Sequence, residues 1–481
     1  MNLKRFFGLL LILAFLLSAV TGCKNNIESS DDEQVDVVYA PNPLKVLVVG
    51  EAQLGPRIAR QWSARRDGKL TIVDKTLEEF VESEFAVDPS FDILIYPPSI
   101  LGELVDRNHV RKVAKFVWTS DELNKNELLR HFRTSIVRHL NQEWAVPLGS
   151  PNFAMFCNRE LFEKMDVAPP KTWDELDRRI KNITESLGED SESGLIAKVD
   201  MPLAKGWAVH SFLARVAPSI RNRGKISTVF DRSSMNPLIT DVPFVEALNQ
   251  LKSIASKRSL ELDPAATYAL ALSEKSSIAF TWPSRGFEVD VETDDEGSGI
   301  DPVMIRPLPG MLKWYDNANQ AWNKRGDEDD GRVDLIGFDG LVASVSDATD
   351  NDATAWEFLQ WLPSKTVSLL TLVDSPSVGP FRASHLGDAS RWTGENISVD
   401  LADDYADIVA DNHERTLVMM FPRIPGSRAY LDSLDEAVRD CIADKLSAEE
   451  ALKAAAKRWD EITDSLDRKK QIEMLRDESR F

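Results

Sequence analysis

Short apolar segments typical of buried strands alternate with amphipathic segments along most of this chain. The first three strand-like segments are residues 45–50, 70–73 and 91–96. The first and third of these are expected to be buried on both faces, as strands of parallel sheets are. Ile58, Ala59 and Trp62 have helical spacing, and Thr76 with Glu79 has the pattern of a capping box that opens a second helix. This order predicts an α/β fold.

The alternation continues to the C-terminus. We expect a helical region over 119–140, a strand over 153–156, a helix from Asn158 and a strand over 277–282. Thr172 with Glu175 and Ser447 with Glu450 predict two more capped helices, and the second of these reaches Leu466. Residues 467–481 are rich in charge, and we expect this tail to fray.

Length and charge limit what kind of protein this chain can be. With 481 residues, of which 43% are hydrophobic, the chain can form about three domains or two large ones. Its 78 acidic and 57 basic side chains give a formal charge of −21. A phosphate backbone would be repelled on average, so nucleic acid is not an expected partner.

The first 23 residues have the features of a signal peptide. Lys4 and Arg5 precede an apolar run over 6–17, which is shorter than the roughly 20 residues of a spanning helix. The small residues before Cys23 resemble a bacterial lipobox, in which the cysteine is lipidated and becomes the new N-terminus. Residues 24–43 are polar, acidic and then proline-containing, as in a flexible linker. We therefore expect an extracytoplasmic, membrane-anchored lipoprotein, in the periplasm or at the cell surface; ordinary secretion is the alternative.

The remaining cysteines and acidic stretches do not form a recognisable metal site. Cys157 and Cys441 are nearly three hundred positions apart, and we expect buried free thiols, although an exported compartment would permit a disulfide. The sequence contains no cluster of Cys or His residues of the kind that binds zinc, and we expect no cofactor. The acidic stretches 288–296 and 327–330 lack the spacing of an EF-hand, so solvated surface insertions are favoured over calcium loops.

Candidate binding residues follow the predicted strands, because ligands of open α/β sheets lie beyond the carboxyl ends of strands. This rule selects six residues: Glu51, Tyr96, Ser99, Trp282, Ser284 and Arg285. The chain has 12 tryptophans, and aromatic platforms with a few polar groups are what a sugar site requires.

Several sequence blocks, taken in order, resemble one family. The blocks are WAVP at 144–147, FAMFCNRELFEK at 153–164, PPKTWDEL at 169–176, IAFTWP at 278–283, PLPG at 307–310, GFDG at 337–340, WEFL at 356–359, PRIP at 422–425 and SAEEAL at 447–452. Together they resemble the extracellular solute-binding proteins of ABC importers, specifically the sugar-binding family that includes maltose-binding protein. Cys157 stands where sugar-binding members commonly have a tyrosine, and an acidic residue expected near Pro151 is missing. Both departures weaken a maltose-like assignment.

The resemblance implies a two-lobed, type II periplasmic-binding-protein-like fold with a hinge and a cleft between the lobes. Matching the blocks places lobe 1 at 44–150 and 341–405, and lobe 2 at 151–340 and 406–466. Glu51 and Tyr96 match family positions at the cleft, and Ser284 falls where some members have a stacking tryptophan. Asn152, Asp339, Arg428 and Tyr430 complete the expected set of binding residues.

The function expected from this resemblance is non-catalytic. A carbohydrate or similar polar solute would bind in the cleft, the lobes would close over it, and the transmembrane subunits of an ABC permease would receive it. A monomer is the simplest expectation. The chain contains no G-x-S-x-G, P-loop or G-x-G-x-x-G motif. Two alternatives remain open: a surface-anchored interaction protein on the same fold, and a glycan-degrading enzyme that uses a carboxylate pair.

Overall fold

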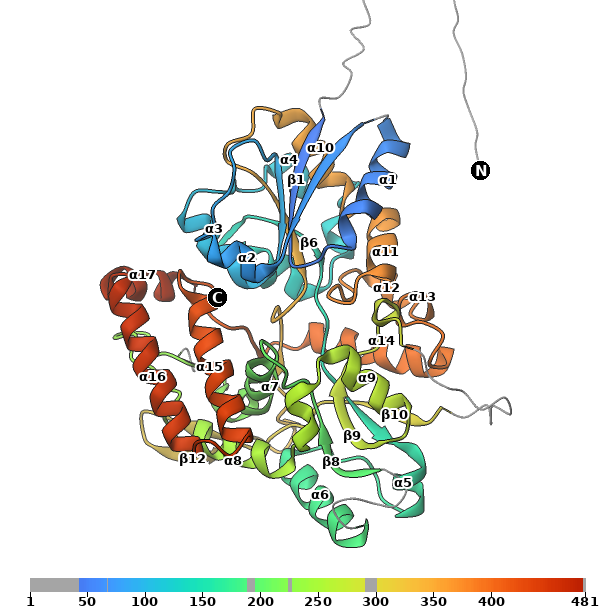
Figure 1. The fold of residues 1–481 in the computed structure, drawn as a ribbon, viewed down its shortest axis with the longest axis vertical. Coiled ribbons are helices and arrows are strands. Elements are labelled where there is room, and N and C mark those ends of the chain that lie inside the picture. Colours follow the sequence, from blue (N-terminus) through green and yellow to red (C-terminus); the bar gives the residue numbers. More distant parts are fainter. Residues whose placement is uncertain (1–42, 67, 188–194, 224–226, 290–300, 479–481) are drawn as a thin grey trace, which may run out of the picture. The chain divides into compact units, whose positions relative to one another are not determined.

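The structure, a computed structural model, describes residues 43–66, 68–187, 195–223, 227–289 and 301–478 (Figure 1). The predicted signal peptide with Cys23, all of the predicted linker except Pro43, and most of the acidic stretch 288–296 lie outside the described residues.

The first of two main sheets has five strands in the order β2-β1-β3-β14-β6. The strands are β1 (Leu44–Val49), β2 (Leu70–Lys75), β3 (Ile93–Tyr96), β6 (Val146–Gly149) and β14 (Leu341–Val345). β1 pairs in parallel with β2 and β3, whereas β14 is antiparallel to β3 and β6. Helices α1 (Leu54–Arg66), α10 (Asp352–Trp361) and α11 (Lys365–Asp374) pack on this sheet. Every residue of β3 is buried, as predicted for a strand covered on both faces. Every residue of β14 is buried as well, although no strand was predicted there.

The second main sheet has four strands in the order β10-β7-β9-β8. These are β7 (Ala154–Asn158), β8 (Ile196–Asp200), β9 (Ser276–Thr281) and β10 (Val303–Pro307). β8 is parallel to β9, and β7 is antiparallel to both β9 and β10. Helices α5 (Arg159–Lys164), α6 (Trp173–Leu187), α9 (Pro264–Leu272) and α14 (Val399–Glu414) contact its strands. Below, residues 44–149 with β14, α10 and α11 are called the first-sheet half, and residues 154–340 and 399–466 are called the second-sheet half.

The second-sheet half also contains a group of longer helices, of which α15 and α16 lie side by side (Figure 1). The group consists of α7 (Ala208–Ile220), α8 (Val242–Ile254), α15 (Ser427–Ile442) and α16 (Ala448–Ser465). The last helix, α17 (Arg468–Glu478), follows α16 and contacts both halves. Shorter elements complete the chain: α2 (Leu77–Glu82), α3 (Leu101–Asp106), α4 (Lys115–Trp118), α12 (Ala383–Leu386), α13 (Ser390–Thr393), β4 (Arg138–His139), β5 (Gln142–Glu143), β11 (Lys313–Asp316), β12 (Ala321–Lys324), β13 (Asp334–Leu335) and β15 (Val418–Met419).

The predicted helix caps are confirmed. The hydroxyl of Thr76 accepts a hydrogen bond from the backbone N–H of Glu79 (3.1 Å), whose carboxylate in turn accepts from the N–H of Thr76 (2.8 Å). The Ser447–Glu450 box has the same reciprocal pattern at the start of α16. Thr172 and Glu175 also exchange hydrogen bonds at the start of α6. These caps satisfy N–H groups that have no partner inside the helix.

Two sequence expectations are wrong. The region 119–140 is not a long helix: it contains a single turn at Lys125–Glu127, a five-residue π-helical segment at Phe132–Ile136 and β4. Its apolar residues enter the core, and Leu129 donates its N–H to the carbonyl of Phe381 rather than to a preceding turn. The described part of the tail does not fray either, because residues 468–478 form α17, which buries Gln471 and Leu475.

The chain passes between the sheets where glycines bring backbone segments very close. It leaves the first sheet after Gly149, enters β7 at Ala154, and returns to the first sheet at β14 directly after Gly340. Both glycines have positive φ, +126° and +105°. A Cβ on Gly340 would lie 2.2 Å from the carbonyl oxygen of Gly149, so no other residue fits there without a backbone shift.

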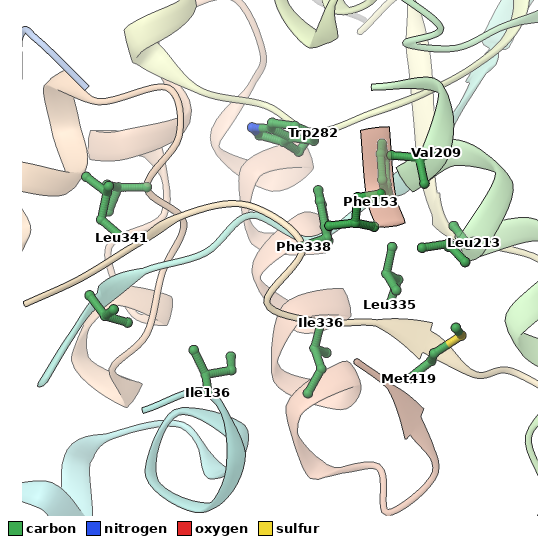
Figure 2. Packing of buried hydrophobic residues seen from close by; sticks show 14 of the residues in the cluster. Ile136, Phe153, Val209, Leu213, Trp282, Leu335, Ile336, Phe338, Leu341 and Met419 are labelled. Atoms are coloured by element: carbon green, nitrogen blue, oxygen red, sulfur yellow. The ribbon is translucent and has the colours of Figure 1, made fainter. Parts of the chain in front are cut away.

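Apolar side chains from several crossing segments meet between the sheets (Figure 2). The rings of Phe153 and Phe338 are stacked with centroids 4.8 Å apart, and Trp282 packs edge-on against Phe153 at 5.5 Å. Below them, Leu335 and Met419 belong to β13 and β15, which form a short parallel ribbon. This junction is therefore a packed core.

The cysteines and the described acidic turn behave as expected. Cys157 and Cys441 are buried free thiols, as predicted. Burial raises the pKa of the Cys157 thiol to about 12.

The acidic turn at 327–330 lies at the surface and is held by arginines, since Asp330 pairs with Arg332 (2.9 Å) and Arg415 (2.5 Å).

Candidate functional site

The carboxyl ends of β1 and β3 place Glu51, Tyr96 and Ser99. Glu51 is buried and accepts a hydrogen bond from the hydroxyl of Ser375 (2.9 Å). Tyr96 is 0% exposed, and its hydroxyl lies 2.6 Å from that of Ser344 in β14. Ser99 is half-buried in a single turn of 3-10 helix, where it lines a small cavity with Phe338 and Arg423. The polar groups of Glu51 and Ser99 therefore lie near the junction between the sheets, whereas the hydroxyl of Tyr96 forms its hydrogen bond within the first sheet.

The carboxyl end of β9 places Trp282, Ser284 and Arg285. Trp282 is 3% exposed and surrounded by aromatic rings, with Trp207 and Phe287 each at 5.8 Å in addition to the two phenylalanines of the junction. Ser284 is buried and accepts a hydrogen bond from the N–H of Gly286 (3.2 Å). Arg285 is exposed. Of these three, Arg285 presents its polar group to solvent.

A two-residue segment joins the ends of the two sheets. Ser375 donates to the carboxylate of Glu51, and the next residue, Pro376, accepts a hydrogen bond from the indole N–H of Trp282 (3.3 Å). Glu51 follows a strand of the first sheet and Trp282 follows a strand of the second. The loop after α11 therefore links both predicted groups of binding residues.

Asp339 and Asn152 lie at the crossings themselves. The Oδ2 atom of Asp339 is buried and has no hydrogen-bond partner within the described part of the chain. Burial raises the pKa of Asp339 to about 7, and the charge of Glu51 acts in the same direction. Asn152 is buried, and its carbonyl accepts from the hydroxyl of Tyr405 (2.8 Å). Glu51 and Asp339 are thus two interacting carboxyl groups, one of which has an unused acceptor atom.

Arg428 and Tyr430 lie on α15 and have different surroundings. Tyr430 is buried, its hydroxyl lies 2.8 Å from that of Thr463, and its ring packs on Phe230 and Trp459. Arg428 lines a cavity of about 860 Å³ and pairs with Asp432 (2.7 Å). The environment of Tyr430 is that of a packing residue, whereas that of Arg428 is open.

Residues from both halves line this cavity. Glu78 in α2 and Lys205 in the loop before α7 both line the cavity and form an ion pair of 2.7 Å, and Asp432 and Arg439 follow Arg428 along one face of α15. Its volume is in the range of small-molecule sites. Sequence reasoning did not select Glu78, Lys205 or Arg439, because charged residues in capped helices and loops carry no pattern that separates a cavity wall from a solvated surface.

Metal ligands and membrane-spanning helices would indicate other kinds of site. The described residues contain no group of three or more His, Cys, Asp or Glu side chains that could hold a metal ion. Among the same residues, none of the helices has both the length and the apolar character needed to cross a membrane.

Comparison with known proteins identifies the family. Residues 110–367, more than half of the chain, match the family of bacterial extracellular solute-binding proteins. The chain belongs to that family. The fold of this solute-binding protein is similar to maltose-bound MalE3 from T. maritima, with a TM-score of 0.61 and 15% identity over 87% of this chain and 99% of the other.

Two further solved structures have a similar fold. The sugar-binding protein MalE from Xanthomonas citri gives a TM-score of 0.65 at 15% identity, covering 89% of this chain and 99% of its own. A ribitol complex of an ABC transporter solute-binding protein from Agrobacterium radiobacter K84 gives 0.64 at 16% identity, with coverages of 87% and 98%. The predicted fold class, a two-lobed type II periplasmic-binding-protein fold, and the predicted family are both confirmed.

Proposed function

We propose that this solute-binding protein is a lipid-anchored extracytoplasmic receptor of an ABC importer that binds a carbohydrate or similar polar solute between its lobes. The observation that carries the proposal is the link through Ser375 and Pro376, which brings Glu51 at the end of β1 together with Trp282 at the end of β9. In open α/β folds, this is where ligands bind. Solved relatives of the same fold hold maltose and ribitol.

The proposed lobes follow the predicted boundaries, 44–150 with 341–405 and 151–340 with 406–466. The sheet topology supports the first two crossings, since β6 ends at Gly149, β7 begins at Ala154 and β14 begins at Leu341. The third crossing, near Asp404, lies within α14, which packs on β10. Closure would bring ligand contacts from both lobes into one site, and those contacts would favour the closed state.

The proposed solute contacts divide into two kinds. Asp339 and Glu51 offer carboxylate acceptors for hydroxyl groups, and the unused Oδ2 atom of Asp339 is the acceptor most in need of a donor. Arg285 and Arg428 offer guanidinium donors at accessible positions. Trp282 supports this site through packing, and its buried ring would have to be uncovered before it could stack on a sugar.

A thermal-shift screen of the full chain tests the proposal. Sugars, polyols and sugar acids are added one at a time, and at about a hundredfold excess over Kd a bound solute adds roughly 2.7 kcal/mol to the free energy of unfolding. Arg285→Ala should reduce the shift and leave the unliganded melt unchanged, because Arg285 is exposed. The matched control is Arg133→Ala, which removes another exposed arginine and should change neither value.

The alternatives give different outcomes. A chain that responds to no solute but captures a specific protein partner is an interaction protein, and a chain that cleaves an added oligosaccharide is an enzyme. Mass spectrometry of the N-terminal peptide tests the proposed anchor: Cys23 should carry acyl chains, and Cys23→Ser should abolish them.

A further inference from the structure

The C-terminal helix α17 makes polar contacts with both halves of the fold. On the second-sheet half, Arg468 donates to the carbonyl of Ser234 (3.3 Å), and Arg232 donates to the carbonyl of Arg476 (2.6 Å). On the first-sheet half, Lys470 pairs with Asp106 at the end of α3 (2.7 Å). Because a helix is rigid over this length, contacts at separate points along α17 fix both halves relative to this one helix.

The last described residue of α17 is inserted into a buried site. The side chain of Glu478 is 9% exposed; its carboxylate accepts two hydrogen bonds from Arg423 (3.0 and 2.9 Å) and lies 2.9 Å from Nδ1 of His139 in β4. Burial alone would raise the pKa of Glu478, but the charge of Arg423 and the interaction with His139 outweigh it and hold the pKa at about 2. The carboxylate is therefore charged at any ordinary pH.

Arg423 connects this site to the junction between the sheets. It follows β15, which pairs with β13, the strand just before the crossing into β14. Its remaining N–H groups donate to the carbonyls of Ser135 (3.1 Å), Ile136 (2.5 Å) and Arg138. The contact with the first-sheet half is close, because a Cβ on Gly102 in α3 would lie 1.7 Å from the carbonyl oxygen of Arg423.

We propose that α17 is a strap across the junction of the two halves. It is held on the second-sheet half by Arg232, Ser234 and Arg423, and its contacts with Asp106 and His139 on the first-sheet half limit how far the halves can separate. Separation would have to break the contacts of α17 with one half or with the other. Glu478 is the anchor, because removing it leaves the buried charge of Arg423 without a carboxylate partner. The strap acts on the hinge movement that the proposed function requires, but it exists without any solute.

The experiment measures the distance between the halves in the full, solute-free chain. Spin labels are placed at Phe116→Cys on the first-sheet half and Leu312→Cys on the second, each of which is 57% exposed in the native chain. Cys157 and Cys441 are buried and should not react, and Cys23→Ser removes the remaining thiol. Pulsed electron resonance then gives the distribution of distances between the labels.

Glu478→Gln and Lys470→Glu should each shift the distribution to longer distances and broaden it. Glu473→Gln, on the exposed side of the same helix, is the matched control and should leave it unchanged. If Glu478→Gln lowers the melting temperature without changing the distances, α17 is only a stabilising helix and the proposal is wrong. If Glu478→Gln does not fold, Lys470→Glu decides, because Lys470 is half-exposed and its reversal repels Asp106. Failure of the sugar screen would leave this result untouched.

Discussion

The hydroxyl of Tyr96 lies 2.6 Å from the hydroxyl of Ser344, which itself donates to the carbonyl of Trp144 (2.7 Å). Because Ser344 has used its proton, Tyr96 is the donor of the pair. Tyr96→Phe removes one hydrogen bond and leaves Ser344 with a partner, so the free energy of unfolding should fall by about 0.5–1.5 kcal/mol in a urea titration. Tyr96→Ala should cost about 3–5 kcal/mol, as for other buried aromatic residues.

The same variant separates a structural role of Tyr96 from a binding role. A Tyr96→Phe chain that keeps its stability but loses all solute-induced thermal shift would show that the hydroxyl contacts the solute, contrary to its buried position in this structure.

Gly340 is predicted to be irreplaceable at the second crossing. Gly340→Ala would force a residue with φ of +105° into backbone contact at 2.2 Å, and should destabilise the protein by at least about 1–3 kcal/mol. Gly387→Ala is the control: nothing lies within 4 Å of the position that its Cβ would occupy, and its φ is −79°. That substitution should be neutral or stabilise by up to about 1 kcal/mol. Equal melting temperatures for the two variants would contradict the crossing geometry.

Two buried histidines should make stability depend on pH. Burial lowers the pKa of His413 to about 3 and that of His131 to about 4, from an ordinary value of 6.5. Between about pH 6.5 and pH 4, the unfolded chain binds protons that the native chain does not. The free energy of unfolding should therefore fall as the pH falls through this window, by at most about 1.4 kcal/mol per pH unit for each histidine.

His413→Phe tests this pH dependence. The ring of His413 stacks on Phe132 at 5.0 Å, and neither of its nitrogens has a hydrogen-bond partner in the described structure. Phenylalanine can keep the packing and cannot bind a proton, so the variant should show a shallower loss of stability between pH 6.5 and pH 4. An unchanged slope in acid unfolding would show that His413 titrates normally in the folded chain.

The carboxylate of Asp177 is predicted to balance the charge of a fully buried guanidinium, that of Arg215. Arg215 is 0% exposed, stacks on Trp173 at 4.3 Å, and pairs with Asp177 at 3.1 Å. Asp177→Ala should cost about 3 kcal/mol, near the lower end for a buried pair because Asp177 is about a quarter exposed. In the double variant that also carries Arg215→Met, chemical unfolding should show that much of the lost free energy of unfolding is regained. A double variant less stable than Asp177→Ala alone would argue that Arg215 contributes mainly through its stacking.

Local patterns were sufficient to predict the α/β class, the helix caps and five of the nine strands in the two main sheets. Buried strands are continuous apolar runs, and a capping box is made by residues three apart, so both are readable from neighbouring positions. The same logic failed over 119–140, where apolar residues at helical spacing enter the core through short turns and through a bond from Leu129 to Phe381. It also failed for the tail, whose order depends on Arg423 and His139, 55 and 339 positions before Glu478.

By itself, the amino-acid sequence predicted the fold class and the strand ends that carry the candidate binding residues, because these depend on residue type and spacing over a few turns. The family came from a resemblance of ordered sequence blocks to known solute-binding proteins. Only the tertiary structure decided how those residues are used. It turned Tyr96 and Tyr430 inward to Ser344 and Thr463, left Oδ2 of Asp339 without a partner among the described residues, and set Glu478 against Arg423. Burial and pairing of a side chain depend on segments that lie from 33 to 248 positions away in these three pairs, and the local periodicity of the sequence does not reveal such partners.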